Sequence, residues 1–372
     1  MRVGVPREIK TEEDRVGLTP GSVREVVAHG HEVLVESGAG LGIGADDLVY
    51  REAGAVVVDG PEAVFEAAEL IVKVKEPQPV ERARLRPEQT LFTYLHLAPD
   101  PEQATDLVAS GATCIAYETV TDRAGHLPLL APMSKVAGRM SVQAGAHWLE
   151  SPQGGMGRLM GGVPGVNPAR VVVIGGGVVG ENATEIAVGM GADVVVVDRN
   201  VAVLDHLAAR FGPAISTAYS TAATLEELVI GADLVIGAVL VKGARAPRLV
   251  TAEMVKAMRA GSVLVDVAID QGGCMETSHP TTHLDPVYVV DEVVHYAVAN
   301  MPGAVPLTSA HALNNSTLPF VLALADRGPV AAMLADPHLA NGLNVHRGQI
   351  TEAAVAEALD RPYIPPLESL RS

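Results

Sequence analysis

The chain has 372 residues, a formal net charge of −17 and only two cysteines. A chain of this length exceeds what one hydrophobic core usually supports, so we expect two domains. The acidic balance argues against a nucleic-acid partner, and the scarcity of cysteine favours the reducing cytoplasm over secretion. No apolar run reaches the roughly 18 residues of a membrane helix, so we expect a soluble protein without a membrane partner.

Short apolar runs alternate with helical patterns over the first third of the chain. Helices are expected, for example, over residues 21–30 and 61–70. Strands are expected between the helical patterns, near 2–5, 32–35, 55–58, 70–75, 91–95 and 113–117. This alternation predicts a parallel sheet that is covered by helices on both faces.

The segment LIVKVKEP (70–77) places two of only six lysines in one expected strand. Lys73 and Lys75 are two residues apart, so both would point to the same face of the sheet. One interpretation is an edge strand that charge keeps soluble. The other is a ligand site at the carboxyl end of the strand, which would involve Lys75 and leave Lys73 as a strand residue one repeat deeper.

A second series of apolar runs predicts another doubly wound sheet. Long helical patterns over 134–150 and 306–326 flank this series, and a loop rich in glycine and proline follows the first of them. The last 46 residues read as helical, with too few strands for a third domain, so we expect them to pack on the first domain. The strands of the second sheet are expected within 170–176, 192–198, 232–240, 261–270 and 286–293.

The strongest motif is the G-x-G-x-x-G of Gly175, Gly177 and Gly180, which directly follows a strand and opens a helix at Val178. The first glycine permits a tight turn, the second lets the backbone approach a pyrophosphate, and the third lets helix and strand pack closely. Asp198 ends the next strand, 18 residues past Gly180, where a carboxylate would accept hydrogen bonds from both ribose hydroxyls. The motif predicts NAD as the cofactor, in preference to NADP.

Ligands of open α/β sheets bind beyond the carboxyl ends of the strands. Asp270 is the one carboxylate that this rule brings near the expected nicotinamide position, although it could instead be a helix cap. In the second sheet the rule selects, as cofactor or catalytic residues, Ser220, Val239, Leu240, Ile269, Asp270 and Asn300.

In the first sheet the same rule brings cations and a histidine to one rim: Arg7, Arg15, Lys75 and His96, with Glu8 beside them. An arginine fork can bind a carboxylate bidentately, and a lysine can polarise a carbonyl oxygen. A histidine that titrates near neutrality can exchange a proton. With Asp270 acting on a water or an amine, the set is typical of a dehydrogenase for 2-oxo or 2-amino acids.

The predicted fold class is therefore α/β, with two doubly wound Rossmann-like domains joined by two long helices across a cleft. Residues 1–128 and 307–372 would form the substrate domain. Residues 129–306 would form the NAD-binding domain.

Segments along the whole chain carry a closer resemblance: MRVGVPREIKTEEDRVGLTP, KVKEP, YLHLA, APMSKVAGRM, GGGVVGENA, HYAVANMPG and VPLTSAHALNNSTLPFV. Together they resemble bacterial L-alanine dehydrogenases from end to end. The resemblance implies that Arg15 and Lys75 bind the substrate and that His96 and Asp270 are catalytic. It also implies the reversible oxidative deamination of L-alanine to pyruvate and ammonium, in a homohexamer. It assigns NAD binding to Ser134, Asp198, Ser220 and the loop around Asn300.

Two departures from that family stand out. Val203 and His279 occupy positions where members often carry a basic residue near the cofactor, so those contacts are not expected here. Some relatives hold a metal between a Glu and a His four residues apart, where this chain has Ala323 and Arg327. We therefore expect no metal at that position.

Two other functions are compatible with the dinucleotide motif. The chain is also similar to the NAD-binding component of proton-translocating transhydrogenase, which passes hydride to a partner subunit and needs no small substrate. A non-catalytic NAD sensor is the third possibility. Neither requires Lys75, His96 and Asp270 together, so these residues favour the dehydrogenase.

Overall fold

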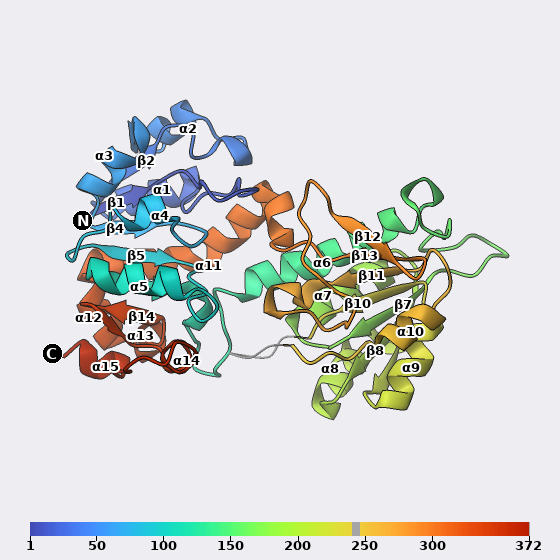
Figure 1. The fold of residues 1–372 in the computed structure, drawn as a ribbon. Coiled ribbons are helices and arrows are strands. Elements are labelled where there is room, and N and C mark those ends of the chain that lie inside the picture. The colour runs from blue at the N-terminus through green and yellow to red at the C-terminus, as the bar shows by residue number, and fades with distance from the viewer. Residues whose placement is uncertain (240–245, 372) are drawn as a thin grey trace. The chain divides into compact units, whose positions relative to one another are not determined.

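The computed structural model describes residues 1–239 and 246–371. The chain forms two compact units (Figure 1). Unit 1 contains Met1–Met133 and Val305–Ser372, and unit 2 contains Ser134–Ala304. The sequence predicts divisions at 128/129 and 306/307, and the compact units divide at 133/134 and 304/305.

Unit 1 is built on an eight-stranded sheet in the order β15-β14-β6-β5-β4-β1-β2-β3. The six strands from the N-terminal part are parallel, whereas β14 and β15 are antiparallel to their neighbours. Their bounds are β1 Arg2–Val5, β2 Glu32–Glu36, β3 Val56–Val58, β4 Leu70–Val72, β5 Thr90–Thr93, β6 Thr113–Ala116, β14 Leu343–His346 and β15 Gln349–Ile350.

For unit 1, one prediction and one of two open interpretations are wrong. The C-terminal tail is not only helical, because β14 and β15 extend the sheet beyond β6. The tail does pack on the first domain, as expected, since these strands belong to its sheet. The strand with the two lysines is not an edge strand: β4 lies between β1 and β5 and ends at Val72, so Lys73 and Lys75 belong to the turn after it.

Helices cover the unit 1 sheet. Side chains of α3, α5 and α14 pack with Ile71, Leu91 and Cys114 in one buried cluster, and α1 packs against α11 (Figure 1). The helices are α1 Pro20–Ala28, α2 Asp47–Glu52, α3 Gly60–Ala67, α4 Pro79–Arg82, α5 Pro101–Ser110, α11 Pro306–Arg327, α12 Pro329–Ala335, α13 Pro337–Ala340, α14 Ala353–Ala358 and α15 Pro366–Ser369, with 3₁₀ turns at Leu41–Ile43 and Tyr117–Thr119.

Unit 2 has a seven-stranded sheet in the order β12-β13-β11-β10-β7-β8-β9, parallel except for β12. Its strands are β7 Arg170–Ile174, β8 Asp193–Asp198, β9 Ile215–Tyr219, β10 Leu234–Gly237, β11 Val263–Asp266, β12 Val287–Val290 and β13 Val293–Tyr296. Its helices are α6 Ala131–Trp148, α7 Val178–Gly189, α8 Val201–Phe211, α9 Ala222–Ile230 and α10 Ala252–Ala257, with 3₁₀ turns at Ser151–Gln153, Gly212–Ala214, Val267–Gln271 and Met301–Ala304.

Two features of the unit 2 sheet differ from the prediction. Strand β9 is missing from the predicted strand ranges, although Ser220 directly follows it, because its sequence ISTAY lacks an apolar run. The run 286–293 is not one strand: Asp291 and Glu292 have φ of 47° and 62°, and the chain reverses there into the antiparallel pair β12 and β13. A two-residue turn with positive φ at both positions is the usual hairpin connection.

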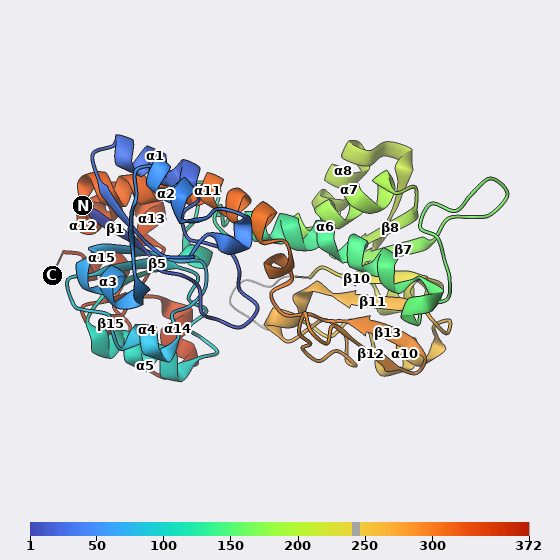
Figure 2. The ribbon, with the colours of Figure 1, turned by 90° about the horizontal axis from the view of Figure 1, so that it is seen from above.

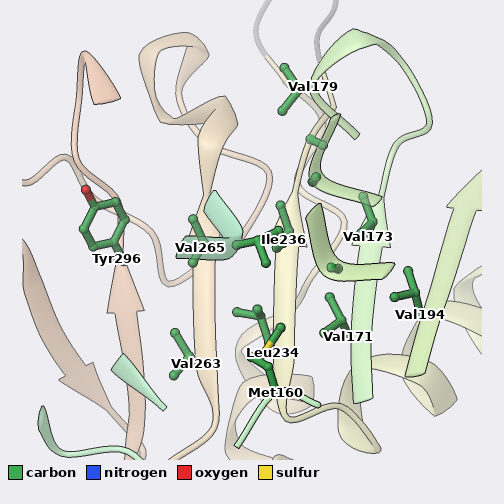
Figure 3. Close-up of a cluster of buried hydrophobic side chains, with 14 of the residues drawn as sticks. Met160, Val171, Val173, Val179, Val194, Leu234, Ile236, Val263, Val265 and Tyr296 are labelled. Atoms are coloured by element: carbon green, nitrogen blue, oxygen red, sulfur yellow. The ribbon is translucent and has the colours of Figure 1, made fainter. Parts of the chain in front are cut away.

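The core of unit 2 follows from alternation along its strands. Val171, Val173 and Ile236 lie on the face covered by α6 and α7 (Figure 3). Val172 and Val235, one residue along, lie on the face covered by α9 and α10. Continuous valine runs are expected in a parallel sheet that is buried on both faces, and Figure 2 shows its strands between flanking helices.

Among the described residues, no single helix is long and apolar enough to cross a membrane. Helices α11 and α12 pass that test only together, as a pair bent by 117°.

Candidate active site

Both sheets have a topological switch point, the place where successive crossovers leave in opposite directions. In unit 1 it lies between β1 and β4, and in unit 2 between β7 and β10. Open α/β sheets bind ligands in the crevice at the carboxyl ends of the two strands at this point. The strand order therefore gives each unit one candidate binding position.

The glycine turn of unit 2 has the geometry that a dinucleotide needs. A Cβ added at Gly180 would come within 1.8 Å of the Gly175 carbonyl oxygen, so the start of α7 can pack on the turn only with glycine there. A Cβ at Gly177 would meet nothing within 4 Å. Gly177 therefore borders open space in front of the α7 N-terminus, where unpaired backbone N–H groups and the helix dipole favour a phosphate.

Asp198, at the end of β8, lies beside this turn. Its Oδ2 accepts a hydrogen bond from the backbone N–H of Gly176 at 2.7 Å, and its Oδ1 accepts one from Asn200 at 2.7 Å. The backbone N–H of Ser220 donates to the Asp198 carbonyl oxygen at 3.0 Å. The carboxylate is thus fixed at the glycine turn and only partly buried.

The other predicted cofactor residues lie on neighbouring segments of unit 2. A Cβ at Gly175 would come within 3.2 Å of the Val239 side chain, so the segment after β10 lies against the turn. Ser134 is one helical turn before Gly138, and a Cβ at Gly138 would come within 2.2 Å of the Val179 carbonyl oxygen at the start of α7. Val178 opens α7, Ile269 and Asp270 follow β11, and Asn300 follows β13. Leu240 lies outside the described residues.

Asp270 is not a helix cap. Asp266 is the N-cap of the 3₁₀ turn Val267–Gln271, and its carboxylate accepts hydrogen bonds from the backbone of Ala268 at 3.1 Å and of Cys274 at 3.0 Å. Asp270 lies inside the turn with an exposed side chain, and no hydrogen bond joins that side chain to another residue within 1–239 or 246–371. The alternative interpretation of Asp270 as a cap is therefore wrong.

In unit 1, Arg15 is buried in an ion pair with Glu13. Its Nε donates to Glu13 Oε1 at 2.6 Å, its Nη2 contacts Glu13 Oε2, and its Nη1 lies 3.0 Å from Met133 Sδ. Burial lowers the pKa of the Arg15 guanidinium, but the hydrogen bonds and charge of Glu13 outweigh burial, so that the net change in pKa is upward. Arg15 is therefore a fixed cation.

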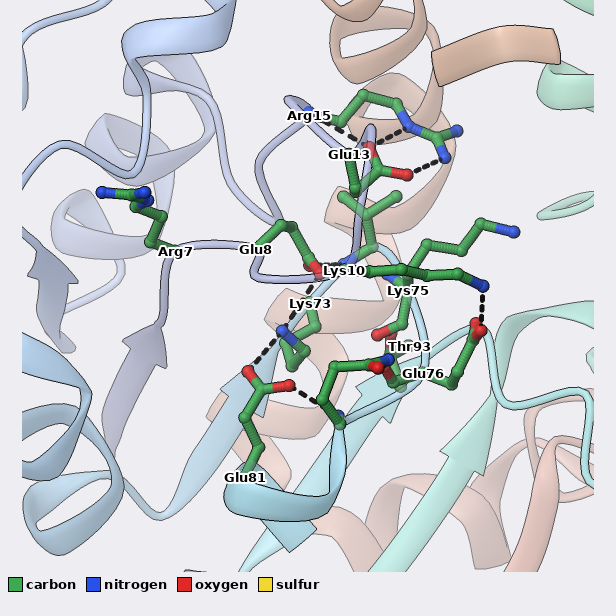
Figure 4. A network of polar contacts seen from close by, with 12 residues as sticks. Arg7, Glu8, Lys10, Glu13, Arg15, Lys73, Lys75, Glu76, Glu81 and Thr93 are labelled. Atoms are coloured by element: carbon green, nitrogen blue, oxygen red, sulfur yellow. Dashed lines mark hydrogen bonds and ion pairs between the residues drawn. The ribbon is translucent and has the colours of Figure 1, made fainter. Parts of the chain in front are cut away.

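The two lysines of the turn after β4 have different surroundings (Figure 4). Lys73 is fully buried, and its Nζ contacts Glu8 and Glu81. Lys75 is half-buried, and its charge helps to lower the pKa of Glu76, although burial acts in the opposite direction. The strand prediction placed both lysines on one face. The structure separates them, because β4 ends before either of them.

His96 follows β5 with an exposed side chain and a left-handed backbone, at φ of 50°. Such a conformation costs about 1–3 kcal/mol in a residue other than glycine. Its backbone N–H donates to Glu118 Oε1 at 2.6 Å, and its ring stacks on Tyr94 at 5.8 Å between centroids. Burial raises the pKa of the Tyr94 hydroxyl, and the charge of Arg15 opposes that change.

No role in the site was predicted for four carboxylates in these contacts, although the carboxyl-end rule does place Glu8 beside the site cations. Each accepts a hydrogen bond from the backbone of a segment that carries a predicted residue: Glu8, Glu13, Glu118 and Asp266. Glu8 and Glu13 lie in the segment REIKTEEDR, whose charge density was a usable signal. Glu118 and Asp266 gave no sequence signal, because an isolated acid after a strand resembles an ordinary cap.

No group of three or more His, Cys, Asp or Glu side chains that could hold a metal ion occurs in the part of the chain that the structure describes. Ala323 and Arg327 both lie in α11.

Two family models match the chain. The N-terminal domain of alanine dehydrogenase/PNT matches residues 4–137, and the C-terminal domain of alanine dehydrogenase/PNT matches residues 141–353.

Individual relatives agree with the family models. The chain is 59% identical to the alanine dehydrogenase of Halomonas elongata, over 98% of both chains. It is 52% identical to the alanine dehydrogenase of Bacillus subtilis, over 100% of this chain and 98% of the relative.

Solved structures of an alanine dehydrogenase and of a transhydrogenase both superpose on this chain, with different degrees of similarity. An L-alanine dehydrogenase superposes with a TM-score of 0.94 at 53% identity, over 97% of this chain and 99% of the other. A transhydrogenase from Sinorhizobium meliloti superposes with a TM-score of 0.81 at 26% identity, over 95% of this chain and 100% of the other.

Proposed function

This chain belongs to the alanine dehydrogenase/PNT family, and we propose that it is an L-alanine dehydrogenase in which Arg15 and Lys75 bind the substrate and His96 and Asp270 transfer protons. The reaction is the NAD-dependent, reversible oxidative deamination of L-alanine to pyruvate and ammonium. NAD supplies the hydride acceptor. The protein residues bind the carboxylate, polarise the carbonyl or imine carbon and move protons.

The cofactor position rests on unit 2. The space in front of Gly177 and the α7 N-terminus would receive the pyrophosphate, and Asp198 would accept hydrogen bonds from the ribose hydroxyls. A negatively charged acceptor at this place disfavours a 2′-phosphate, which supports NAD over NADP.

The substrate position rests on unit 1. Lys75 is a compact cation in the turn after β4, suited to a single carbonyl oxygen. Glu13 holds the Arg15 guanidinium in place through Nε and Nη2, so a substrate carboxylate would bind through the other edge of the guanidinium without its reorganising during the reaction. His96 carries an exposed imidazole on a fixed backbone and is suited to exchange a proton with the substrate.

Asp270 would act as the second proton-transfer group. Water must add to the imino carbon during deamination and leave during amination, so a base that orders water or the amine is required. The exposed carboxylate of Asp270, in a 3₁₀ turn that Asp266 fixes, meets this requirement.

The observation that favours a dehydrogenase over a hydride-passing transhydrogenase subunit is the charged switch point of unit 1. A protein that hands hydride to another subunit has no use for Arg15, Lys75 and His96 in the loops after the neighbouring strands β1, β4 and β5. The more distant relation to the transhydrogenase structure agrees with this choice.

The direct test is NADH formation by the purified chain from L-alanine and NAD at alkaline pH, with Lys75→Met as the matched variant. The wild type should form NADH, and Lys75→Met should bind NADH normally but lose kcat/KM for pyruvate by several kcal/mol, roughly the loss of a charged hydrogen bond in the transition state. Lys75→Arg should recover little activity. A wild-type chain without alanine-dependent NADH formation would contradict the proposal.

We further propose that the enzyme works in the cytoplasm as a homo-oligomer, with the hexamer as the expected state. The scarcity of cysteine supports the cytoplasmic location, since the chain has two cysteines in 372 residues. The resemblance to hexameric enzymes supports the hexamer. Light scattering on the size-fractionated protein measures the oligomeric mass, and a monomer would contradict the proposal.

A further inference from the structure

A buried lysine lies between two buried glutamates at the switch point of unit 1 (Figure 4). Lys73 Nζ is 3.1 Å from Glu8 Oε2 and 2.7 Å from Glu81 Oε1, and each of the three side chains is at most 2% exposed. We call these three residues the acidic clamp. It belongs to none of the groups assigned above to the reaction.

Each glutamate of the acidic clamp uses its second oxygen on the backbone of the turn after β4. Glu8 Oε1 accepts hydrogen bonds from the N–H groups of Val74 at 2.6 Å and Lys75 at 3.4 Å. Glu81 Oε2 accepts one from the N–H of Gln78 at 2.7 Å. The acidic clamp therefore binds both ends of the turn that carries Lys75.

Stability alone is a weak reason for such a cluster. Apolar residues of similar volume often replace a buried ion pair without loss of stability, but they cannot accept backbone hydrogen bonds. Burial raises the pKa of Glu8, although Lys73 and the Val74 N–H oppose that change. Burial lowers the pKa of Lys73, but both glutamates outweigh burial, and the net change in pKa is upward. Lys73 therefore remains charged.

We propose that Glu8 is a positioning residue, which fixes the backbone of Lys75 so that its ammonium group meets the substrate. Lys73 and Glu81 hold the Glu8 carboxylate in place. This inference rests on the proposed role of Lys75 in substrate binding. It predicts that the fit of Lys75 to its substrate depends on a carboxylate that does not touch that substrate.

The substitution Glu8→Gln is a sharp probe because glutamine has the same shape but only one acceptor oxygen. Both oxygens of Glu8 face donors, so the new amide must turn its NH₂ group toward either the Val74 N–H or the Lys73 ammonium. The substitution Glu81→Gln meets the same conflict, between Lys73 and the Gln78 N–H. The two substitutions remove the same charge from the same lysine and differ only in which end of the turn they release.

The experiment compares Glu8→Gln with Glu81→Gln. Steady-state NADH oxidation with pyruvate and ammonium gives kcat and KM, NADH fluorescence gives the cofactor Kd, and thermal unfolding gives the Tm. Glu8→Gln should lower kcat/KM for pyruvate at least about tenfold, because small displacements of a catalytic group have effects of that order or larger. Glu81→Gln should stay within about threefold of the wild type. Both should lose similar Tm and keep the wild-type Kd for NADH.

Equal kcat/KM in the two folded variants would overturn the proposal and leave the acidic clamp a purely structural feature. If Glu8→Gln does not fold, Glu8→Asp replaces it. Aspartate keeps the charge but is one methylene too short to reach both Lys73 and the Val74 N–H. The expected result is the same loss of kcat/KM, and a folded Glu8→Asp with wild-type kcat/KM would overturn the proposal.

Lys75→Met in the same assay distinguishes the proposed substrate contact of Lys75 from the positioning role of Glu8. A large loss in Lys75→Met with none in Glu8→Gln contradicts only the positioning role of Glu8. Wild-type kcat/KM in Lys75→Met contradicts the proposed substrate contact itself and, with it, the positioning role.

Discussion

The two sheets share one strand order around their switch points but differ in the residues that come after the strands there. In unit 1, β1 and β4 are followed by charged side chains that are buried and paired, such as Glu8 with Lys73. In unit 2, β7 is followed by a glycine turn that borders open space at Gly177. The same topology thus supports a site made of fixed charges and a site made of space and backbone N–H groups.

The difference follows from ligand size and charge. A three-carbon acid offers few contacts, so recognition must come from strong, oriented charges. A dinucleotide offers a long diphosphate backbone, so close approach of the protein backbone matters more than any one side chain. Substitutions that remove charge should therefore impair the substrate site of unit 1. Substitutions that fill space should impair the cofactor site of unit 2.

The largest expected effect tests whether each unit contributes one proton-transfer group. His96→Ala and Asp270→Asn should each lose turnover by about 10²–10⁴-fold, the usual contribution of a positioned acid or base. Both should still bind NADH with the wild-type Kd, measured by fluorescence titration. If the double variant is no slower than the singles, the two residues act as one unit. Near-normal turnover in either single variant removes that residue from the mechanism.

The glycines of unit 2 allow a test that separates an effect on cofactor binding from an effect on folding stability. Gly177→Ala places a methyl group in open space, so the protein should keep its Tm while its Kd for NADH rises at least about tenfold, or about 1.4 kcal/mol. Gly180→Ala forces a Cβ to within 1.8 Å of the Gly175 carbonyl oxygen, so it should lower the Tm of the apoprotein as well. If Gly177→Ala binds NADH normally, no phosphate lies at that turn.

A second effect on cofactor binding is expected at Asp198, the carboxylate that lies beside the glycine turn of unit 2. Asp198→Ala should weaken NAD binding and raise the NADP/NAD preference by about 1–3 kcal/mol, the effect of removing a buried hydrogen-bonding partner. The ratio of kcat/KM for the two cofactors measures it. Because Asp198 also binds the Gly176 N–H, the Tm must be followed as a control. An unchanged ratio excludes a contact with the ribose.

The smallest effect concerns pH and compares a buried histidine of each unit. Burial lowers the pKa of His295 in β13 and of His346 in β14 from the ordinary 6.5, and Arg347 adds to the change at His346. A histidine with a lowered pKa in the folded state binds fewer protons there than in the unfolded chain. Its stabilising contribution is therefore present above pH 6.5 and is lost as the pH falls through the folded-state pKa.

Urea unfolding between pH 5 and 8 should show stability falling below about pH 6.5, the ordinary histidine pKa. His295→Gln and His346→Gln should each flatten that dependence, and substitution of the exposed His126 provides the control. If both variants keep the wild-type dependence of unfolding free energy on pH, the lowered pKa values of His295 and His346 do not cause that dependence.

The sequence alone determined the features that depend on local pattern. Valine runs on both faces predict a buried parallel sheet, and the spacing from Gly175 to Asp198 predicts a dinucleotide turn, because tight turns and close helix packing restrict which residues are possible. The carboxyl-end rule also selected Arg15, Lys75 and His96 for one rim, since parallel strands bring their ends to the same edge.

Only the tertiary structure decided the features that depend on which segments become neighbours. The sequence could not show that β4 is central and short, that Lys73 is buried between Glu8 and Glu81, or that β14 extends the sheet. Glu8 and Lys73 are 65 positions apart in the chain, and the paired strands β6 and β14 are more than 200 positions apart. Local periodicity carries no information about such pairings, because burial of a charge depends on the partner that folding brings to it.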